Sequence, residues 1–235
     1  MLDIPGGLTL SVLLVTLTTF VGFLFAVSFS KNPSISKYAT WIAIPVLLWI
    51  IFQSTLSLNR WYMNRASAPL IFPYVFTAGC TLVLLIVPRL RDWVLGLRME
   101  VLLWMIVLRL PIELLLQWSA RFRQSSWDLT SYGGSVELFF GLTAPLMIWL
   151  LRKQSNTGRK VLLAWNVAGV LSLCFLWIKG LMGAPSTIQT RAFDTPNYLL
   201  VHFPGSWIVT VIIPILLFAH LAIVTQLLKR IKHQA

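Results

Sequence analysis

The sequence predicts an all-α polytopic integral membrane protein with seven transmembrane helices, its N-terminus outside and its C-terminus in the cytoplasm. Hydrophobic residues make up 57% of the chain and charged residues only 11%, whereas soluble domains carry about 25% charged residues. The apolar residues form runs close to the ~20 residues that an α-helix needs to cross a bilayer. Most basic residues lie between these runs. We therefore expect residues 1–235 to form a single transmembrane helical domain.

The first three expected spans cover residues 8–29, 38–58 and 69–87. No basic residue precedes the first run, so we interpret it as a retained helix rather than a cleaved signal peptide. The second run ends at the polar segment NRWYMNR, and Pro88 and Arg89 close the third. None of these runs shows the ~10-residue alternation of a barrel strand, which favours helices.

The fourth expected span, residues 95–117, is the most informative because it carries Glu100, Arg109 and Glu113. A charge at membrane depth is costly and indicates a partner or a function. Arg109 and Glu113 are four residues apart and share a helix face, which allows them to pair. Pro111 lies between them, and it should kink the helix and leave a backbone carbonyl for a neighbouring polar group.

The last three expected spans cover residues 136–151, 161–178 and 207–228. The fifth is short and contains Pro145, so it either crosses the membrane or re-enters on the same side. The seventh contains His220, which has no second ligand at metal-binding spacing. We expect His220 to form hydrogen bonds between helices.

The distribution of Lys and Arg predicts the orientation, because basic residues concentrate on the cytoplasmic side of membrane proteins. With the N-terminus outside, the cytoplasmic segments contain twelve of the 19 basic residues: Lys31, Lys37, Arg89, Arg91, Arg98, Arg152, Lys153, Arg159, Lys160, Lys229, Arg230 and Lys232. The expected outer segments are longer and chemically mixed, so we expect any site on that side.

Polar groups within the spans suggest an outward-facing cavity that binds or conducts a small polar or anionic solute, or that relays protons. Its candidate lining residues come from three spans and are Arg109, Glu113, Gln53, Asn166 and Lys179. The alternative is a structural ion pair between Arg109 and Glu113 that fixes the fourth span against its neighbours.

Two further hypotheses belong to other classes of protein. The first is a membrane-embedded enzyme acting on a lipid-like substrate at the outer leaflet, with Glu113, Asp128, Asp194 and His202 as candidate acid–base groups. These groups lie in or beside the mixed outer segments. If the loop that carries His202 folds over the mouth of the cavity, His202, Asp194 and Glu113 can form an acid–base cluster, although their spacing does not require it. The second is a helper or scaffold subunit of a membrane complex, whose charged fourth span pairs with a helix of a partner protein.

The sequence also argues against several functions. A formal net charge of +12 would suggest nucleic acid in a soluble protein, but basic residues in short loops are typical of lipid-headgroup contacts, so no nucleic-acid partner is expected. Cys80 and Cys174 lie in apolar runs, and the histidines lie at different depths, so neither a metal nor another cofactor is expected. Motifs for nucleotide hydrolysis and serine hydrolases are absent.

The expected location is a lipid bilayer, that of a bacterial cytoplasmic membrane.

Overall fold

The computed structural model describes residues 5–30, 39–63, 67–131, 134–153 and 155–232, and these residues form helices and loops without a strand. The α-helices are α1 (Gly6–Ser28), α3 (Ala39–Leu58), α4 (Ser67–Ile86), α5 (Pro88–Gly96), α6 (Met99–Ile106), α7 (Arg109–Arg121), α8 (Asp128–Ser131), α9 (Gly134–Lys153), α10 (Asn156–Met182) and α11 (Ile213–Lys232). Short 3₁₀ segments lie at Trp61–Met63 and Tyr198–Val201, and a π-helical turn, Ile208–Ile212, leads into α11.

Four helical segments are long and apolar enough to cross a membrane: Gly6–Ser28, Trp41–Leu58, Asn156–Met182 and Ile208–Ile231. A fifth is added if Ile71–Ile86 and Pro88–Gly96, which meet at 89°, count as one span. The chain is therefore an all-helical protein suited to a membrane, as the composition predicts. Its fourth expected span is divided between α6 and α7, and its fifth corresponds to α9.

The break between α6 and α7 has a local cause. Pro111 has no amide hydrogen, so it cannot donate to the carbonyl of Val107 four residues earlier. That carbonyl instead accepts the amide of Leu110 at 3.0 Å, in a tighter turn. The expectation that it would serve a neighbouring polar group is therefore wrong. Arg109 lies within this turn as the first residue of α7.

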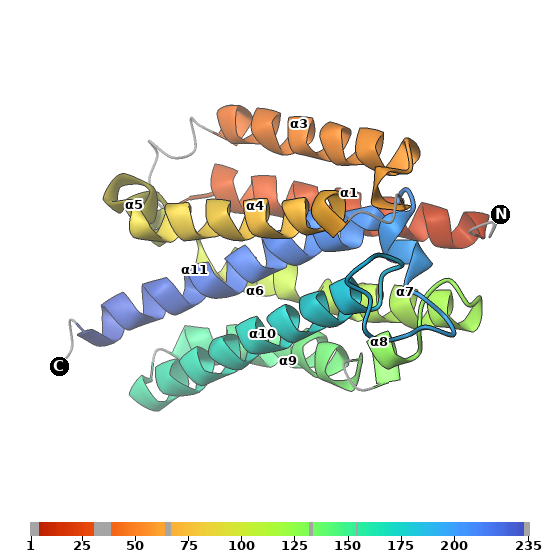
Figure 1. Ribbon diagram of the computed structural model, residues 1–235. Coiled ribbons are helices and arrows are strands. Elements are labelled where there is room, and N and C mark those ends of the chain that lie inside the picture. Colours follow the sequence, from red (N-terminus) through yellow and green to blue (C-terminus); the bar gives the residue numbers. More distant parts are fainter. Residues whose placement is uncertain (1–4, 31–38, 64–66, 132–133, 154, 233–235) are drawn as a thin grey trace.

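The helices run beside one another, with α11 inside the bundle and α3 at its edge (Figure 1). The burial of the membrane-length segments shows the same difference. In Ile208–Ile231, 78% of the apolar segment is buried, whereas in Trp41–Leu58 only 11% is buried. Helix α11 contacts α10, α6, α4 and α5, whereas α9 contacts α6, α7 and α10. The start of α1 and the end of α11 lie at opposite ends of the bundle (Figure 1).

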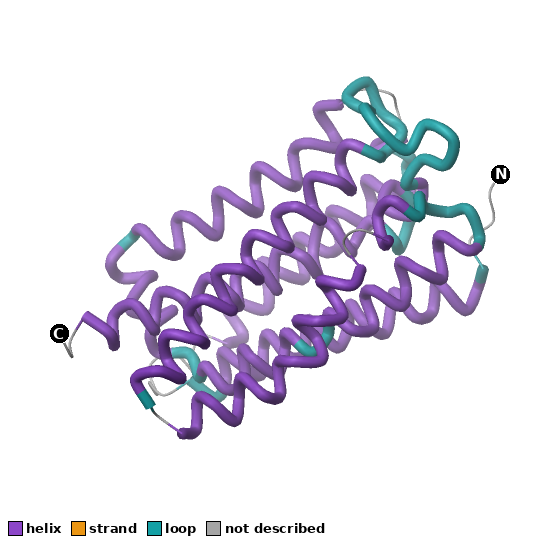
Figure 2. The backbone as a smooth tube through the Cα atoms, turned by 90° about the horizontal axis from the view of Figure 1, so that it is seen from below, coloured by secondary structure: helices purple, strands orange, loops and turns teal. Residues whose placement is uncertain are grey.

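Loops gather at the two ends of the bundle, and the longest of them, residues 183–207, covers one end (Figure 2). This loop is held to the helices by backbone hydrogen bonds, including Leu199 N–H to the carbonyl of Gln124 at 2.8 Å. Its residues Leu199, Leu200 and Val201 are buried. It is therefore a packed part of the fold, and we call this end of the bundle the capped end.

Candidate functional site

Arg109 and Glu137 form a buried ion pair between α7 and α9. Arg109 Nε donates to Glu137 Oε2 at 2.6 Å, and Nη2 donates to Oε1 at 2.5 Å. Their side chains are 0% and 2% exposed. The expected pairing of Arg109 with Glu113 is wrong, because the guanidinium edge is matched by both oxygens of one carboxylate on another helix. Spacing along one helix does not reveal such a partner.

The same guanidinium group is satisfied from two further helices. Nη1 lies 3.1 Å from Nε2 of His220 on α11, and Nη2 donates to Ser172 Oγ on α10 at 2.5 Å. The Phe140 ring of α9 lies beneath it, with the guanidinium carbon 4.3 Å from the ring centroid. All three nitrogens of this buried cation therefore have a polar partner, and one face of the guanidinium lies on an aromatic ring.

His220 links Arg109 to Asn166 of α10. Its Nδ1 lies 2.9 Å from Asn166 Oδ1, and Asn166 Nδ2 donates to the carbonyl of Leu162 at 2.8 Å. An arginine can only donate, so His220 Nε2 accepts and Nδ1 carries the proton that is donated to Asn166. His220 thus bonds between helices, as expected. We call Arg109, Glu137, Ser172, His220 and Asn166 the Arg109 cluster.

Gly169 lets the imidazole lie against α10. A Cβ atom built on Gly169 would be 2.3 Å from His220 Cε1 and 2.7 Å from Nδ1, far inside normal contact. The absence of a side chain on the face of α10 that also carries Asn166 therefore makes room for the ring. The role of Gly169 could not be predicted from the sequence, because His220, which packs against it, is 51 residues away in the chain.

Glu113 lies close to this cluster but is only half satisfied. Its side chain is buried, and Oε1 accepts a hydrogen bond from Gln117 Nε2 at 2.8 Å, one turn toward the capped end. Oε2 has no hydrogen-bond partner among the described residues. The carboxylate also interacts electrostatically with Glu137 and with Lys179, so it lies near a charged group of α9 and one of α10.

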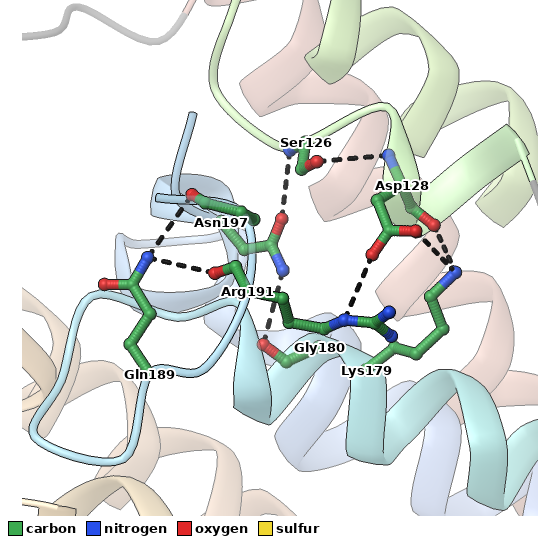
Figure 3. A network of polar contacts seen from close by, with 8 residues as sticks. Ser126, Asp128, Lys179, Gly180, Gln189, Arg191 and Asn197 are labelled. Atoms are coloured by element: carbon green, nitrogen blue, oxygen red, sulfur yellow. Dashed lines mark hydrogen bonds and ion pairs between the residues drawn. The ribbon is translucent and has the colours of Figure 1, made fainter. Parts of the chain in front are cut away.

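A second charged group lies at the capped end (Figure 3). The Asp128 carboxylate is 3.6 Å from Lys179 Nζ and 3.4 Å from Arg191 Nε, and Lys179 also donates to the backbone carbonyl of Asp128. Asn197 holds the loop in place by accepting from Ser126 N–H at 3.0 Å. We call Asp128, Lys179 and Arg191 the Asp128 cluster.

The remaining predicted residues lie apart from both clusters. Gln53 accepts the hydroxyl hydrogen of Tyr62, and no hydrogen bond connects it to Arg109 or Asn166 in the described chain. His202 places Nδ1 2.8 Å from the carbonyl of Tyr198, and Asp194 is exposed. No hydrogen bond or ion pair within the described ranges joins Glu113, Asp194 and His202, so the expected acid–base cluster does not form.

Sequence reasoning names Glu137 as one of several polar candidates from other spans, but it does not assign Glu137 to Arg109 and does not place His220 in the same cluster. The available signal was that each is an ionisable residue within an expected span. Arg109, Asn166 and His220 have no exposed surface, whereas Ser172 is half-buried, so the centre of the cluster is buried within the helices. No group of three or more His, Cys, Asp or Glu side chains suited to a metal occurs in the described part of the chain.

The fold and these contacts define a class: an all-helical, membrane-suited protein with a buried charged cluster shared by α7, α9, α10 and α11. No protein-family model, curated protein or solved structure matches the chain. The candidate functional site of this protein therefore consists of the two clusters and Glu113.

Proposed function

We propose that this chain is a seven-span protein of a bacterial cytoplasmic membrane that binds protons and relays them across the bilayer, from the capped end past Glu113 and the Arg109 cluster to the opposite end. The observation that carries the proposal is Glu113, a buried carboxyl group that has no hydrogen-bond partner for Oε2 among the described residues and that interacts electrostatically with one member of each charged cluster. An ionisable group within a membrane protein is a functional candidate by default. A proton on Oε2 would break no hydrogen bond that the carboxyl group now makes.

The groups lead from one partly exposed residue at the capped end to residues that are buried. Asp128 is 32% exposed at the capped end, and its partner Lys179 is 3% exposed. Lys179 interacts with Glu113, and Glu113 interacts with Glu137. Glu137 binds Arg109, which contacts His220. Protons entering at Asp128 would therefore meet the titratable groups Lys179, Glu113 and Glu137 before they reach Arg109, whose guanidinium keeps its proton.

The charge balance favours a proton over the wider class of small polar or anionic solutes. The two clusters and Glu113 contain three cationic side chains, Arg109, Lys179 and Arg191, and three acidic ones, Glu113, Glu137 and Asp128. The set is neutral when all are ionised, so no anionic solute is needed to offset a buried charge. The enzyme hypothesis gains no support, because Glu113, Asp194 and His202 do not form an acid–base cluster in the described chain. The helper hypothesis is not favoured either, because Arg109 is already paired within the chain.

Proton flux tests this function. The purified chain in liposomes with an internal pH-sensitive dye should dissipate an imposed pH gradient faster than empty liposomes. Glu113→Gln keeps the shape of the side chain but cannot exchange a proton, so flux should fall by about a hundredfold, the lower range of a positioned proton-transfer group. Flux equal to that of empty liposomes for the wild type, or an unchanged rate for Glu113→Gln, would refute the relay.

The matched control is Glu100→Gln. Glu100 belongs to the same interrupted span, but it pairs with Arg152 at the other end of the bundle, where the side chains are 42% and 66% exposed. Because Glu100 is outside the series from Asp128 to His220, this variant should conduct protons at the wild-type rate. A loss of flux in Glu100→Gln equal to that in Glu113→Gln would show that the assay reports general damage.

The topology has its own test. The proposed seven spans are α1, α3, α4, the α6–α7 pair, α9, α10 and α11 with its π-helical start. An odd number of spans places the two termini on opposite sides of the membrane. In a variant with Cys80 and Cys174 replaced by serine, Gly6→Cys should react with an impermeant maleimide from outside the cell. Lys229→Cys should react only after permeabilisation. Labelling of both from one side would contradict an odd number of spans.

A further inference from the structure

An apolar groove separates α3 from the rest of the bundle. Its larger part encloses about 1020 Å³ and its smaller part about 510 Å³. The two parts are continuous, because they share the lining residues Phe23, Pro45, Val46, Phe76, Cys80 and Leu84. The groove therefore runs along α3, between it and α1, α4 and α11, for much of the length of the helices.

The larger part ends at α5, where its lining changes from apolar to charged. Arg89, Leu90, Asp92 and Trp93 line it there. Helix α5 meets the preceding helix at 89° and lies across the end of the bundle opposite the capped end (Figure 1). A helix turned across the end of a span, with Trp and Arg side chains, is typical of a segment at the level of lipid headgroups.

Arg89 and Asp92 present opposite charges to the same end of the groove. They are three residues apart and share a helix face. Both are exposed, and neither makes a hydrogen bond or an ion pair through its side chain within the described residues. The groove therefore offers one cationic and one anionic group at headgroup level and apolar side chains beyond them.

We propose that this groove binds one phospholipid with an ethanolamine headgroup. Its acyl chains lie along the apolar lining, its phosphate binds the Arg89 guanidinium, and its ammonium donates hydrogen bonds to the Asp92 carboxylate. Arginine matches phosphate oxygens in geometry and charge. A glycerol headgroup has no cation for Asp92, and a choline headgroup has no N–H to donate. The two lining charges therefore select the ethanolamine headgroup.

Lipid selectivity tests the site. The delipidated chain in micelles is given equimolar phosphatidylethanolamine, phosphatidylglycerol and phosphatidylcholine with identical acyl chains, and native mass spectrometry counts the lipid that stays bound. The wild type should retain one phosphatidylethanolamine per chain, about tenfold over the other two, which corresponds to about 1.4 kcal/mol. Retention of the three lipids in the supplied ratio would overturn the proposal.

Charge variants on α5 separate the two contacts. Arg89→Ala should reduce retention of all three phospholipids by about tenfold, because each carries a phosphate. Asp92→Asn should keep binding but remove the preference for ethanolamine. Arg91→Ala is the matched control, since Arg91 is exposed on the same helix but does not line the groove, and it should behave as the wild type. Equal effects of Arg89→Ala and Arg91→Ala would contradict the site.

A groove-filling variant tests the same site without changing charge. Gly79 lines the larger part, and a Cβ atom there would meet nothing within 4 Å. Gly79→Phe should therefore fold normally, with an unchanged or raised Tm, and lose the bound lipid. Leu171→Phe, at a 65% exposed position of α10 outside the groove, is its control. Lipid retained by Gly79→Phe at the wild-type level would overturn the proposal.

Discussion

Arg109→Met is expected to lower the free energy of unfolding by about 3–5 kcal/mol, the cost of removing one partner from a buried ion pair. The methionine side chain fills a similar space, but Glu137 would keep its charge with 2% exposure and without the two hydrogen bonds from Arg109. His220 and Ser172 would each lose a donor as well. Unfolding measured in mixed micelles by increasing the fraction of denaturing detergent reports this change.

Two companion variants make the measurement specific to the buried pair. Arg109→Met combined with Glu137→Leu should recover most of the loss, because replacing both members of a buried pair by apolar groups is often neutral. Arg152→Met removes an ion pair with Glu100 that is largely exposed, so it should change stability by less than about 1 kcal/mol. A loss below about 1 kcal/mol for Arg109→Met itself would show that the cluster contributes little.

Gly169→Ala is expected to lower the free energy of unfolding by about 1–3 kcal/mol, the usual cost of inserting a methyl group into a packed interior. The new Cβ would lie 2.3 Å from His220 Cε1, so the imidazole must move and its bonds to Arg109 and Asn166 must lengthen. Thermal unfolding in detergent measures the loss.

The control for Gly169→Ala is Gly79→Ala, which makes the same substitution on α4. A Cβ on Gly79 meets nothing within 4 Å, so this variant should be neutral or stabilising by about 0.5–1 kcal/mol from the higher helix propensity of alanine. If Gly169→Ala were as stable as Gly79→Ala, the close packing of His220 on α10 would not hold.

The helices could largely be predicted because apolar runs of membrane length have few alternatives to an α-helix. The expected runs at residues 8–29 and 38–58 correspond closely to α1 and α3. The kink near Pro111 also followed from its missing amide hydrogen. The new partner of the Val107 carbonyl did not, because the shift to the Leu110 amide depends on how the next turn tightens.

The site was predictable in its members but not in its contacts. Arg109, Asn166 and Glu113 were found because polar groups are costly within a span. The partner of Arg109 was not, because helix spacing compares residues four apart, whereas Glu137 is 28 residues away on α9. Gln53 has the same sequence signature as Asn166, but it lies against Tyr62. Only the packing of the helices distinguishes these two amides.

The order of the Arg109 cluster along the chain has a consequence for biogenesis. Arg109 is synthesised before each of its partners. Glu137 follows it after 28 residues and His220 after 111 residues. A lone arginine at the centre of a helix opposes release from the translocon by about 2.5–3.5 kcal/mol. In the seven-span topology proposed above, the helix that bears Arg109 should therefore remain at the translocon until α9 emerges. The two helices should then enter the lipid as a pair, and α11 should complete the cluster last.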